Sequence, residues 1–185
     1  SAAGATGSIA GQLARAMGCR VVGITSTDEK CQWLTDSIGF NAAINYTHED
    51  WPQHLKKACS GGIDVYFDNA GGDVLNVALD QISDGARIVL CGGISRYNST
   101  AAQTGPENYF NLIFRRAKME GFIVLDYASK FNSAISSMKP LIASGQLKHK
   151  ATITDGFEAL PDALISIFEG TNIGKQIVCI SPPSA

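Results

Sequence analysis

Small residues are concentrated in the first stretch of the sequence, SAAGATGSIAGQ, with a spacing that leaves room beside the backbone. Gly4 and Gly7, followed by Gly11, stand around the start of a helix predicted over 7–17. Such glycines let the backbone approach a pyrophosphate and let the helix pack closely on a strand, while the N–H groups that open the helix face the phosphates. Small residues also fill tight turns for packing alone, but the helix and the VVGI strand that follow favour a dinucleotide.

The end of that strand, VVGITSTDEK, carries hydroxyls and a lysine where an NAD-binding site usually has an acid. Thr25 and Ser26 end the strand, and Lys30 follows them. A carboxylate would repel a 2′-phosphate, whereas hydroxyls and an ammonium would hold it, so we predict NADP(H) as the cofactor. We expect Asp28 to cap the next helix. The alternative for Lys30 is a solvated lysine in the first helical turn.

Further polar and small residues stand where later strands end, and open α/β sheets bind ligands at those ends. Asn69 of DNAGGD can hydrogen-bond a cofactor or cap a turn, and Gly92 and Gly93 of CGGISRYNST let a flat group lie on the backbone. Tyr97 follows in a loop, where a lone tyrosine is more often a packing residue than a catalytic one. Asn172 has the chemistry of an ordinary turn asparagine.

Strands and helices alternate along the chain and must position these residues. The strands lack a polar face, as parallel strands buried on both sides do. We therefore predict an α/β fold, a Rossmann-type doubly wound parallel sheet in three layers with right-handed crossovers. The predicted strands are 19–24, 41–46, 63–69, 86–92 and 120–127, and the helices are 7–17, 28–38, 49–59, 73–82, 107–117 and 130–144. A strand in KATITDG, a helix in FEALPDALISIFEG and a strand in GKQIVCI close the sequence.

Composition excludes several classes of function. The 185 residues suffice for one α/β domain, and a net charge of -2 predicts no binding to nucleic acid or to an anionic membrane. No stretch reaches the length of a membrane span, so we expect a cytoplasmic protein. The five cysteines and three histidines are scattered, which favours buried thiols and no metal site. A glycine turn with no strand before it leads us to expect that the chain begins partway through a longer protein.

Taken together, six motifs resemble the prostaglandin reductase branch of the medium-chain dehydrogenase/reductases, most closely its type 2 members. The resemblance extends from Ser1 to Ser181 and rests on SAAGATGSIAGQ, Glu29–Lys30, GFNAAINY, DVYFDNAGG, CGGISRYN and NIGKQIVCIS. It implies a zinc-independent, NADPH-dependent 15-oxoprostaglandin 13-reductase. In the implied reaction, hydride passes to the β-carbon of an α,β-unsaturated ketone, a phenol stabilises the charge on the carbonyl oxygen, and solvent supplies a proton.

The resemblance also implies roles for individual residues. Tyr97 would be the catalytic phenol, and Lys30 and Tyr46 would hold the 2′-phosphate and adenosine side. The pyrophosphate would lie on Gly4, Ala5, Thr6, Gly7 and Ser8. The nicotinamide half would contact Asn69, Cys91, Gly92, Gly93, Ile94, Ser95, Phe122, Ile123, Val124 and Asn172.

Two departures from the family shape these expectations. The family's small N-terminal catalytic domain is absent, so we expect 1–147 to form an NADP-binding domain that lacks its first strand. The return segment 148–185 would pack on the absent domain; we expect its strands to be unpaired and this chain alone to bind cofactor without turnover. A proline-rich loop bordering the lipid cleft is reduced to Pro106, which makes shorter enones or alkenals as plausible as prostaglandins.

Two alternatives stay open from the sequence. One is a noncatalytic NADPH-binding module or redox sensor on the same fold, and the other is a relative of the zinc-dependent alcohol dehydrogenases. For the enzyme we expect a small enone as substrate and a homodimer formed through the edge strand EGFIVLDY.

Overall fold

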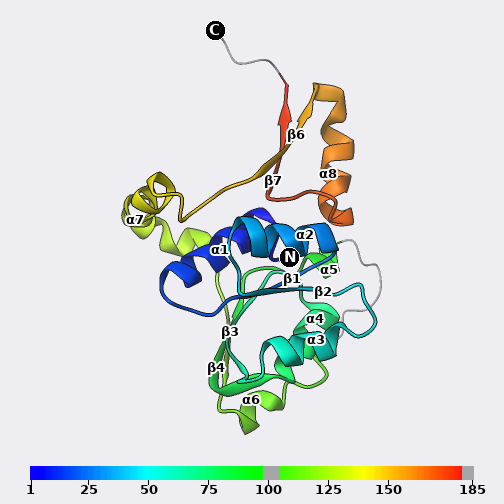
Figure 1. Ribbon diagram of the computed structural model, residues 1–185, viewed down its shortest axis with the longest axis vertical. Coiled ribbons are helices and arrows are strands. Elements are labelled where there is room, and N and C mark those ends of the chain that lie inside the picture. Colours follow the sequence, from blue (N-terminus) through cyan, green and yellow to red (C-terminus); the bar gives the residue numbers. More distant parts are fainter. Residues whose placement is uncertain (98–104, 181–185) are drawn as a thin grey trace. The chain divides into compact units, whose positions relative to one another are not determined.

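The computed structural model describes residues 1–97 and 105–180 (Figure 1). These residues form two compact units. The terminal unit combines Ser1–Asn45 with Leu141–Ala185, and the central unit is Tyr46–Pro140. All strand pairings within either unit are parallel, as predicted for an α/β protein.

The first half of the terminal unit is a β-α-β arrangement that follows helix α1 in the sequence. Strands β1 and β2 pair in register from Val22↔Ala42 to Thr25↔Asn45. Its elements are α1 (Ala5–Ala16), β1 (Val22–Thr25), α2 (Asp28–Gln32), a π-helical turn η1 (Trp33–Ser37) and β2 (Ala42–Asn45). Its core is apolar and consists of Ala3, Leu34, Ile38 and Phe40, with Ala2, Val21, Trp33 and Ala43 packed against them.

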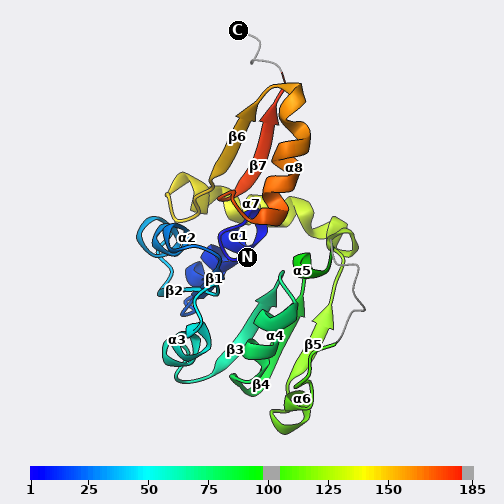
Figure 2. The same cartoon turned by 90° about the vertical axis from the view of Figure 1, so that its right-hand side faces the viewer.

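The second half of the terminal unit is another β-α-β arrangement. It contains β6 (Ala151–Asp155), a 3₁₀ turn η3 (Phe157–Ala159), α8 (Leu160–Glu169) and β7 (Lys175–Cys179). Figure 2 shows α8 beside the β6–β7 pair. The expectation of unpaired strands was wrong, because β6 and β7 pair with each other from Ala151↔Lys175 to Asp155↔Cys179.

A three-stranded sheet in the order β3-β4-β5 forms the core of the central unit. Its buried cluster is Leu75, Leu79, Ile82, Ala86 and Ile88. The elements are α3 (Trp51–Ala58), β3 (Ile63–Asp68), α4 (Gly72–Leu79), β4 (Ile82–Leu90), α5 (Ile94–Tyr97), α6 (Asn111–Phe114), β5 (Lys118–Gly121), a 3₁₀ helix η2 (Val124–Lys130) and α7 (Phe131–Ala143), whose last turn crosses into the terminal unit.

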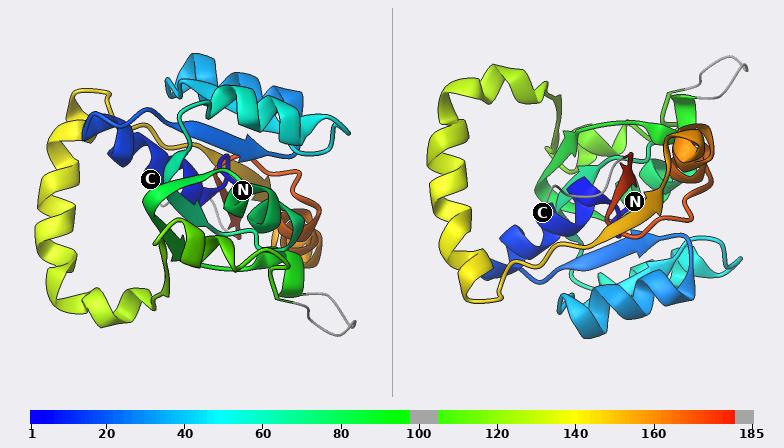
Figure 3. Two further views of the ribbon diagram at one scale, coloured as in Figure 1. Left: turned by 90° about the horizontal axis from the view of Figure 1, so that it is seen from below. Right: turned by 90° about the horizontal axis from the view of Figure 1, so that it is seen from above.

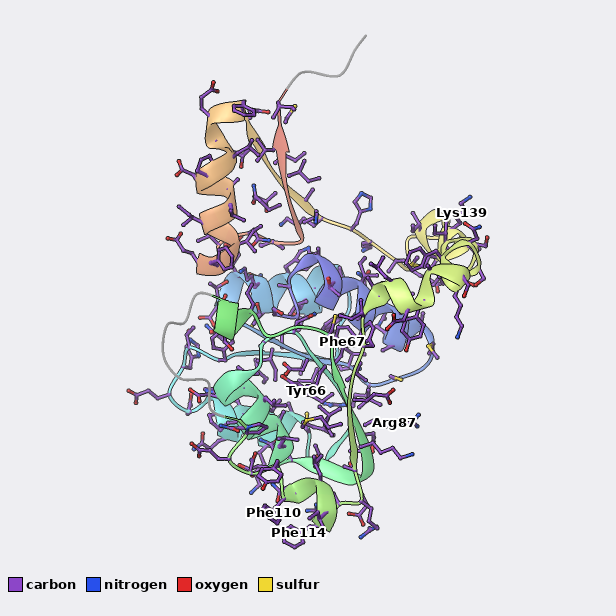
Figure 4. All side chains as sticks on the ribbon, turned by 180° about the vertical axis from the view of Figure 1, so that it is seen from behind. Tyr66, Phe67, Arg87, Phe110, Phe114 and Lys139 are labelled. Carbon is purple, nitrogen blue, oxygen red and sulfur yellow. The ribbon has the colours of Figure 1, made fainter. Side chains whose placement is uncertain are left out.

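Near α6 a hydrogen-bonded contact anchors the chain to the end of α4. The Nδ2 atom of Asn111 donates to Leu79 O at 3.2 Å, and that of Asn108 donates to Asn76 O at 2.7 Å. Phe110 and Phe114 project outward here and are 53% and 69% exposed (Figure 4). The helix predicted over 107–117 is therefore only the single turn Asn111–Phe114.

The strand predicted over 120–127 was wrong in its second half. Strand β5 ends at Gly121, and the chain then turns into η2. The Phe122 and Tyr127 rings meet edge to face at 5.9 Å, and the Lys130 ammonium lies 5.6 Å from the centre of the Tyr127 ring. These local contacts favour a turn, since no neighbouring strand pairs with this apolar run within the described residues. Figure 3 shows η2 and α7 as successive helical segments, here called the η2–α7 arm, and neither helix buries a residue.

Within the described residues, no helix is both long and apolar enough to cross a bilayer.

Candidate functional site

The glycine turn leads directly into α1. Gly4 is the N-cap in an extended conformation, with φ -79° and ψ 172°; no side chain caps the helix, and its first turn holds no acid. The N–H groups of the first helical turn have no partner within the helix, and its dipole places positive potential there. This end of α1 therefore fits an anionic group.

Glycine is required in this turn because other backbone lies very close. A Cβ atom on Gly7 would stand 2.6 Å from the Ser1 carbonyl oxygen, and one on Gly4 would stand 3.3 Å from the same atom. Ser8 is buried, and its hydroxyl donates to Ala5 O at 3.4 Å. The predicted close approach of helix and preceding chain is thus present, although pyrophosphate contacts at Ala5, Thr6 and Ser8 stay a prediction.

The turn before β7 lies against the glycine turn. Gly4 and Gly174 form a parallel bridge, and Gly174 N donates to Ala3 O at 2.8 Å. The Nδ2 atom of Asn172 donates to Gly174 O at 2.9 Å. The structure therefore brings Asn172 close to the glycine turn, a proximity that the chemistry of Asn172 alone did not predict.

Lys30 is buried, with 6% of its surface exposed. Its Nζ atom donates to the Gly170 carbonyl and lies 3.5 Å from Ser26 Oγ. Gly170 is the C-cap of α8 in the left-handed conformation, so the ammonium lies at the negative end of that helix dipole. Burial lowers the pKa of Lys30, and the nearby Glu29 carboxylate opposes this effect. The solvated lysine considered as an alternative is not what the structure shows.

The cap of α2 differs from the prediction. Thr27, not Asp28, is the N-cap, and its Oγ1 atom accepts from Lys30 N at 3.2 Å. Asp28 instead accepts a 2.8 Å hydrogen bond from the side chain of Asn45, the last residue of β2. Tyr46 follows Asn45 in sequence, is 39% exposed and belongs to the central unit.

In the central unit, the ends of β3 and β4 are hydrogen-bonded to each other. Asp68 O accepts from Cys91 N at 2.8 Å and from Gly92 N at 3.1 Å, and Asn69 O accepts from Ile94 N at 3.1 Å. The structure thus brings Asn69 together with the predicted run Cys91–Ser95. Burial, aided by the charge of Asp68, raises the pKa of the Cys91 thiol.

The sequence analysis missed Asp68, which is only 1% exposed. Its Oδ1 atom accepts from Ala70 N and Gly71 N, each at 2.9 Å, and from the Tyr66 hydroxyl at 3.2 Å. Burial and this carboxylate raise the pKa of the Tyr66 phenol. An acid at the end of an apolar strand, directly before small turn residues, is the signal that could have identified it.

The structure says less about the remaining predicted residues. Tyr97 is the last residue of α5, and its side chain lies outside the described part of the structure. Phe122 is half-buried, whereas Ile123 and Val124 are 63% and 58% exposed. Among the described residues, no group of three or more His, Cys, Asp or Glu side chains could hold a metal ion.

The matching family is described as zinc-binding dehydrogenase and covers residues 5–140. The Bacillus subtilis protein YfmJ, whose name describes an NADP-dependent oxidoreductase, is 44% identical over 99% of this chain and 55% of its own length. A 2-alkenal reductase (NADP(+)-dependent) from Nicotiana tabacum is 40% identical over 98% of this chain and 53% of its own. Prostaglandin reductase 1 from Bos taurus is 39% identical over 96% of this chain and 54% of its own length.

Solved structures have the same fold as this chain. CurA from Vibrio vulnificus, solved in complex with NADPH, superposes with a TM-score of 0.93 at 39% identity, covering 99% of this chain and 56% of CurA. The Escherichia coli quinone oxidoreductase complexed with NADPH shares the fold, with a TM-score of 0.79 at 24% identity. The Rossmann-type fold is confirmed. The chain spans about half the length of the curated relatives it matches.

Proposed function

We propose that this chain, which belongs to the zinc-binding dehydrogenase family of the medium-chain dehydrogenase/reductases, is the NADPH-binding part of an enone or alkenal reductase. The support from relatives is that they carry the names of NADP-dependent oxidoreductases, a 2-alkenal reductase and a prostaglandin reductase at 39–44% identity. The resemblance identified from the sequence motifs points to the same class of reaction. Small α,β-unsaturated carbonyl compounds are the proposed substrates.

The observation that carries the cofactor proposal is the position of Lys30. A buried ammonium close to Ser26 at the end of β1 offers positive charge to a 2′-phosphate, and the same unit holds the uncapped start of α1. The lysine has three N–H donors and directs one at Gly170 O, so donors remain for a phosphate oxygen. The backbone around Gly4 and Gly7 leaves the close approach that a pyrophosphate requires.

When bound, NADPH would supply the hydride for the β-carbon of the substrate. Tyr97 would donate a hydrogen bond to the substrate carbonyl oxygen, where negative charge develops, and a solvent proton would complete the saturated product. Asn69 and the Cys91–Ser95 run would position the nicotinamide half.

A binding titration with NADPH and NADH tests the cofactor site. We expect Lys30→Ala to weaken NADPH binding by about 10- to 100-fold, the usual effect of losing a charge-assisted hydrogen bond, and to leave NADH unaffected. Lys30→Arg should retain most of the preference, and Lys139→Ala, on an exposed position of α7 (Figure 4), is the matched control. Equal binding of both nucleotides by the parent chain would refute the role of Lys30.

Enone reduction by the full-length protein tests the activity. We expect NADPH oxidation that depends on a short enone or alkenal, followed by absorbance at 340 nm in the roughly micromolar to millimolar substrate range typical of enzymes. Tight NADPH binding without reduction of any enone, alkenal or 15-oxoprostaglandin would instead support a noncatalytic NADPH-binding module.

A homodimer is also proposed, and it is placed on β5 because only the first two residues of the expected edge strand EGFIVLDY lie in a strand. Strand β5 lies at the edge of its sheet, and Lys118 and Glu120 are exposed on either side of Met119. In an antiparallel pairing about a two-fold axis at Met119, Lys118 would face Glu120 of the partner subunit. Sedimentation velocity should show a dimer that Lys118→Glu weakens and the charge swap with Glu120→Lys restores; a monomer at every concentration would contradict it.

A cytoplasmic location is proposed for the protein. The structure describes all five cysteines, and each is a thiol rather than part of a disulfide, which suits a reducing compartment. Subcellular fractionation with an antibody to the chain checks this.

A further inference from the structure

Asp68 closes the turn that follows β3. One carboxylate oxygen accepts hydrogen bonds from two successive backbone amides, Ala70 N and Gly71 N, and a third from Tyr66. Figure 4 shows Tyr66 among the strands of the central unit. A side-chain carboxylate that binds the backbone two and three residues ahead fixes the conformation of the turn between them. The Asn69–Gly71 turn is thus held by a side chain that is almost fully buried.

The Asn69–Gly71 turn is hydrogen-bonded to the start of α5. Ala70 O accepts from Ser95 Oγ at 2.6 Å and from Ser95 N at 3.3 Å, and Asn69 O accepts from Ile94 N. Three consecutive carbonyls, those of residues 68, 69 and 70, therefore receive donors from residues 91–95. Gly71 and Gly72 both have positive φ, and a Cβ on either would contact Ser95 Oγ at 3.5 and 3.3 Å. The two turns behave as one hydrogen-bonded body.

We propose that Asp68 is a positioning residue of the reductase, which through the Asn69–Gly71 turn and Ser95 fixes the direction of α5 and hence the place of Tyr97. The inference rests on the proposed function. Tyr97 is the last residue of the single-turn helix that Ile94 and Ser95 begin, so a rotation of that turn displaces it directly. Asp68 itself is buried and acts on the reaction only through backbone.

A displacement of Tyr97 should lower the rate of the reaction more than it lowers the affinity for NADPH. A misplacement of about 1 Å of a catalytic group costs roughly a hundredfold in rate. Pyrophosphate and 2′-phosphate contacts, the charged ones, are proposed on residues of the terminal unit, which Asp68 does not hold. The nicotinamide half, proposed on Asn69 and Cys91–Ser95, would supply a smaller share of the affinity. We therefore expect the Asp68→Asn variant to lower kcat about tenfold to a hundredfold, with NADPH Kd changed less than about threefold because the phosphate contacts supply most of the binding.

The experiment combines kinetics of the full-length protein with amide hydrogen exchange of the same variants without cofactor. Ser95→Ala removes one hydrogen bond to Ala70 O, and it should lower kcat in the same direction but less than Asp68→Asn. Asp73→Asn, an exposed acid in the first turn of α4, is the matched control and should change nothing. Exchange at Ala70–Gly71 and Cys91–Ser95 should accelerate in Asp68→Asn and stay at the parent rate in Asp73→Asn.

The outcomes separate the inference from the function on which it rests. A loss of kcat at nearly constant NADPH Kd, with faster exchange confined to the two turns, supports the role of Asp68. Parent-like kcat in Asp68→Asn and Ser95→Ala, or exchange that accelerates throughout the central unit, overturns it. If the parent binds NADPH but reduces no enone, the proposed function fails, and exchange alone then decides whether Asp68 holds the turns. If Asp68→Asn does not fold, Ser95→Ala decides by the same measurements.

Discussion

The Lys30 ammonium is buried, and burial makes its charge sensitive to pH. Because its pKa is lowered from the ordinary value, it loses its proton at a lower pH than an exposed lysine would. Only the protonated form attracts a 2′-phosphate, so the preference for NADPH over NADH should decline as pH rises through the lowered pKa. The ratio of the two dissociation constants between pH 7 and 10 measures this. Lys30→Arg, which stays charged, should keep the ratio constant; a parent ratio that also stays constant would contradict the prediction.

The phenol of Tyr97 gives the second prediction at the scale of a residue. Tyr97→Phe removes the donor expected to stabilise the carbonyl oxygen, and loss of one such donor costs about a hundredfold or more in kcat. NADPH affinity should hardly change. Steady-state kinetics and a titration check this, with Tyr109→Phe, at a 52% exposed tyrosine, as the control. Equal turnover of Tyr97→Phe and parent would remove Tyr97 from the mechanism.

Helix α1 depends on a glycine that contacts the core. A Cβ on Gly11 would stand 2.2 Å from the tip of the Phe40 ring, which is itself only 5% exposed. Gly11→Ala should therefore lower the free energy of unfolding by about 1–3 kcal/mol through overpacking. Gly61→Ala, where nothing lies within 4 Å, should leave it nearly unchanged. Denaturant unfolding measures both, and an equal stability of the two variants would mean that α1 shifts to accommodate the methyl group.

Helices and strands also show which parts of the fold the sequence could predict. Strands β1 to β4 were found from uniform apolar runs, and their predicted places agree with the structure to within a few residues, apart from β4, which begins at Ile82. EGFIVLDY has the composition of a strand, yet only its start pairs, because pairing depends on a neighbour that composition does not reveal. Thr27 and Asp28 are both good capping residues, so their order of use was decided by geometry. The link between the Asp68 turn and residues 91–95 escaped prediction because it joins residues more than twenty positions apart.

At the scale of the whole molecule, residues 141–180 belong with the first 45 residues. The amide of Gln12, 2% exposed, exchanges two hydrogen bonds with the Lys148 backbone, at 2.9 and 2.8 Å. A domain ending at 147 would leave this buried amide without those partners. We expect a chain truncated after 147 to unfold at a lower temperature than one truncated after 180, since each unsatisfied buried polar group costs about 1–3 kcal/mol. Coincident melting curves would support 1–147 as an independent domain.

The η2–α7 arm is the other large segment with a testable property, its low burial. Because none of its residues is buried, little apolar contact is lost when it opens. Amides of 124–140 should exchange much faster than those of β4, which includes the core residues Ile82, Ala86 and Ile88. Hydrogen exchange followed by mass spectrometry measures both segments in one experiment. Protection of the arm equal to that of β4 would show that it packs in solution.

The hydrogen bond from Lys30 to Gly170 links a helix end to the proposed 2′-phosphate site. An ammonium that binds both the carbonyl of Gly170, the C-cap of α8, and a 2′-phosphate couples the two interactions: whatever strengthens one strengthens the other by the same factor. NADH has no such phosphate and would leave the α8 terminus as it is. The two cofactors would then differ in more than affinity, and the mobility of the Gly170–Asn172 turn would report which nucleotide the protein holds.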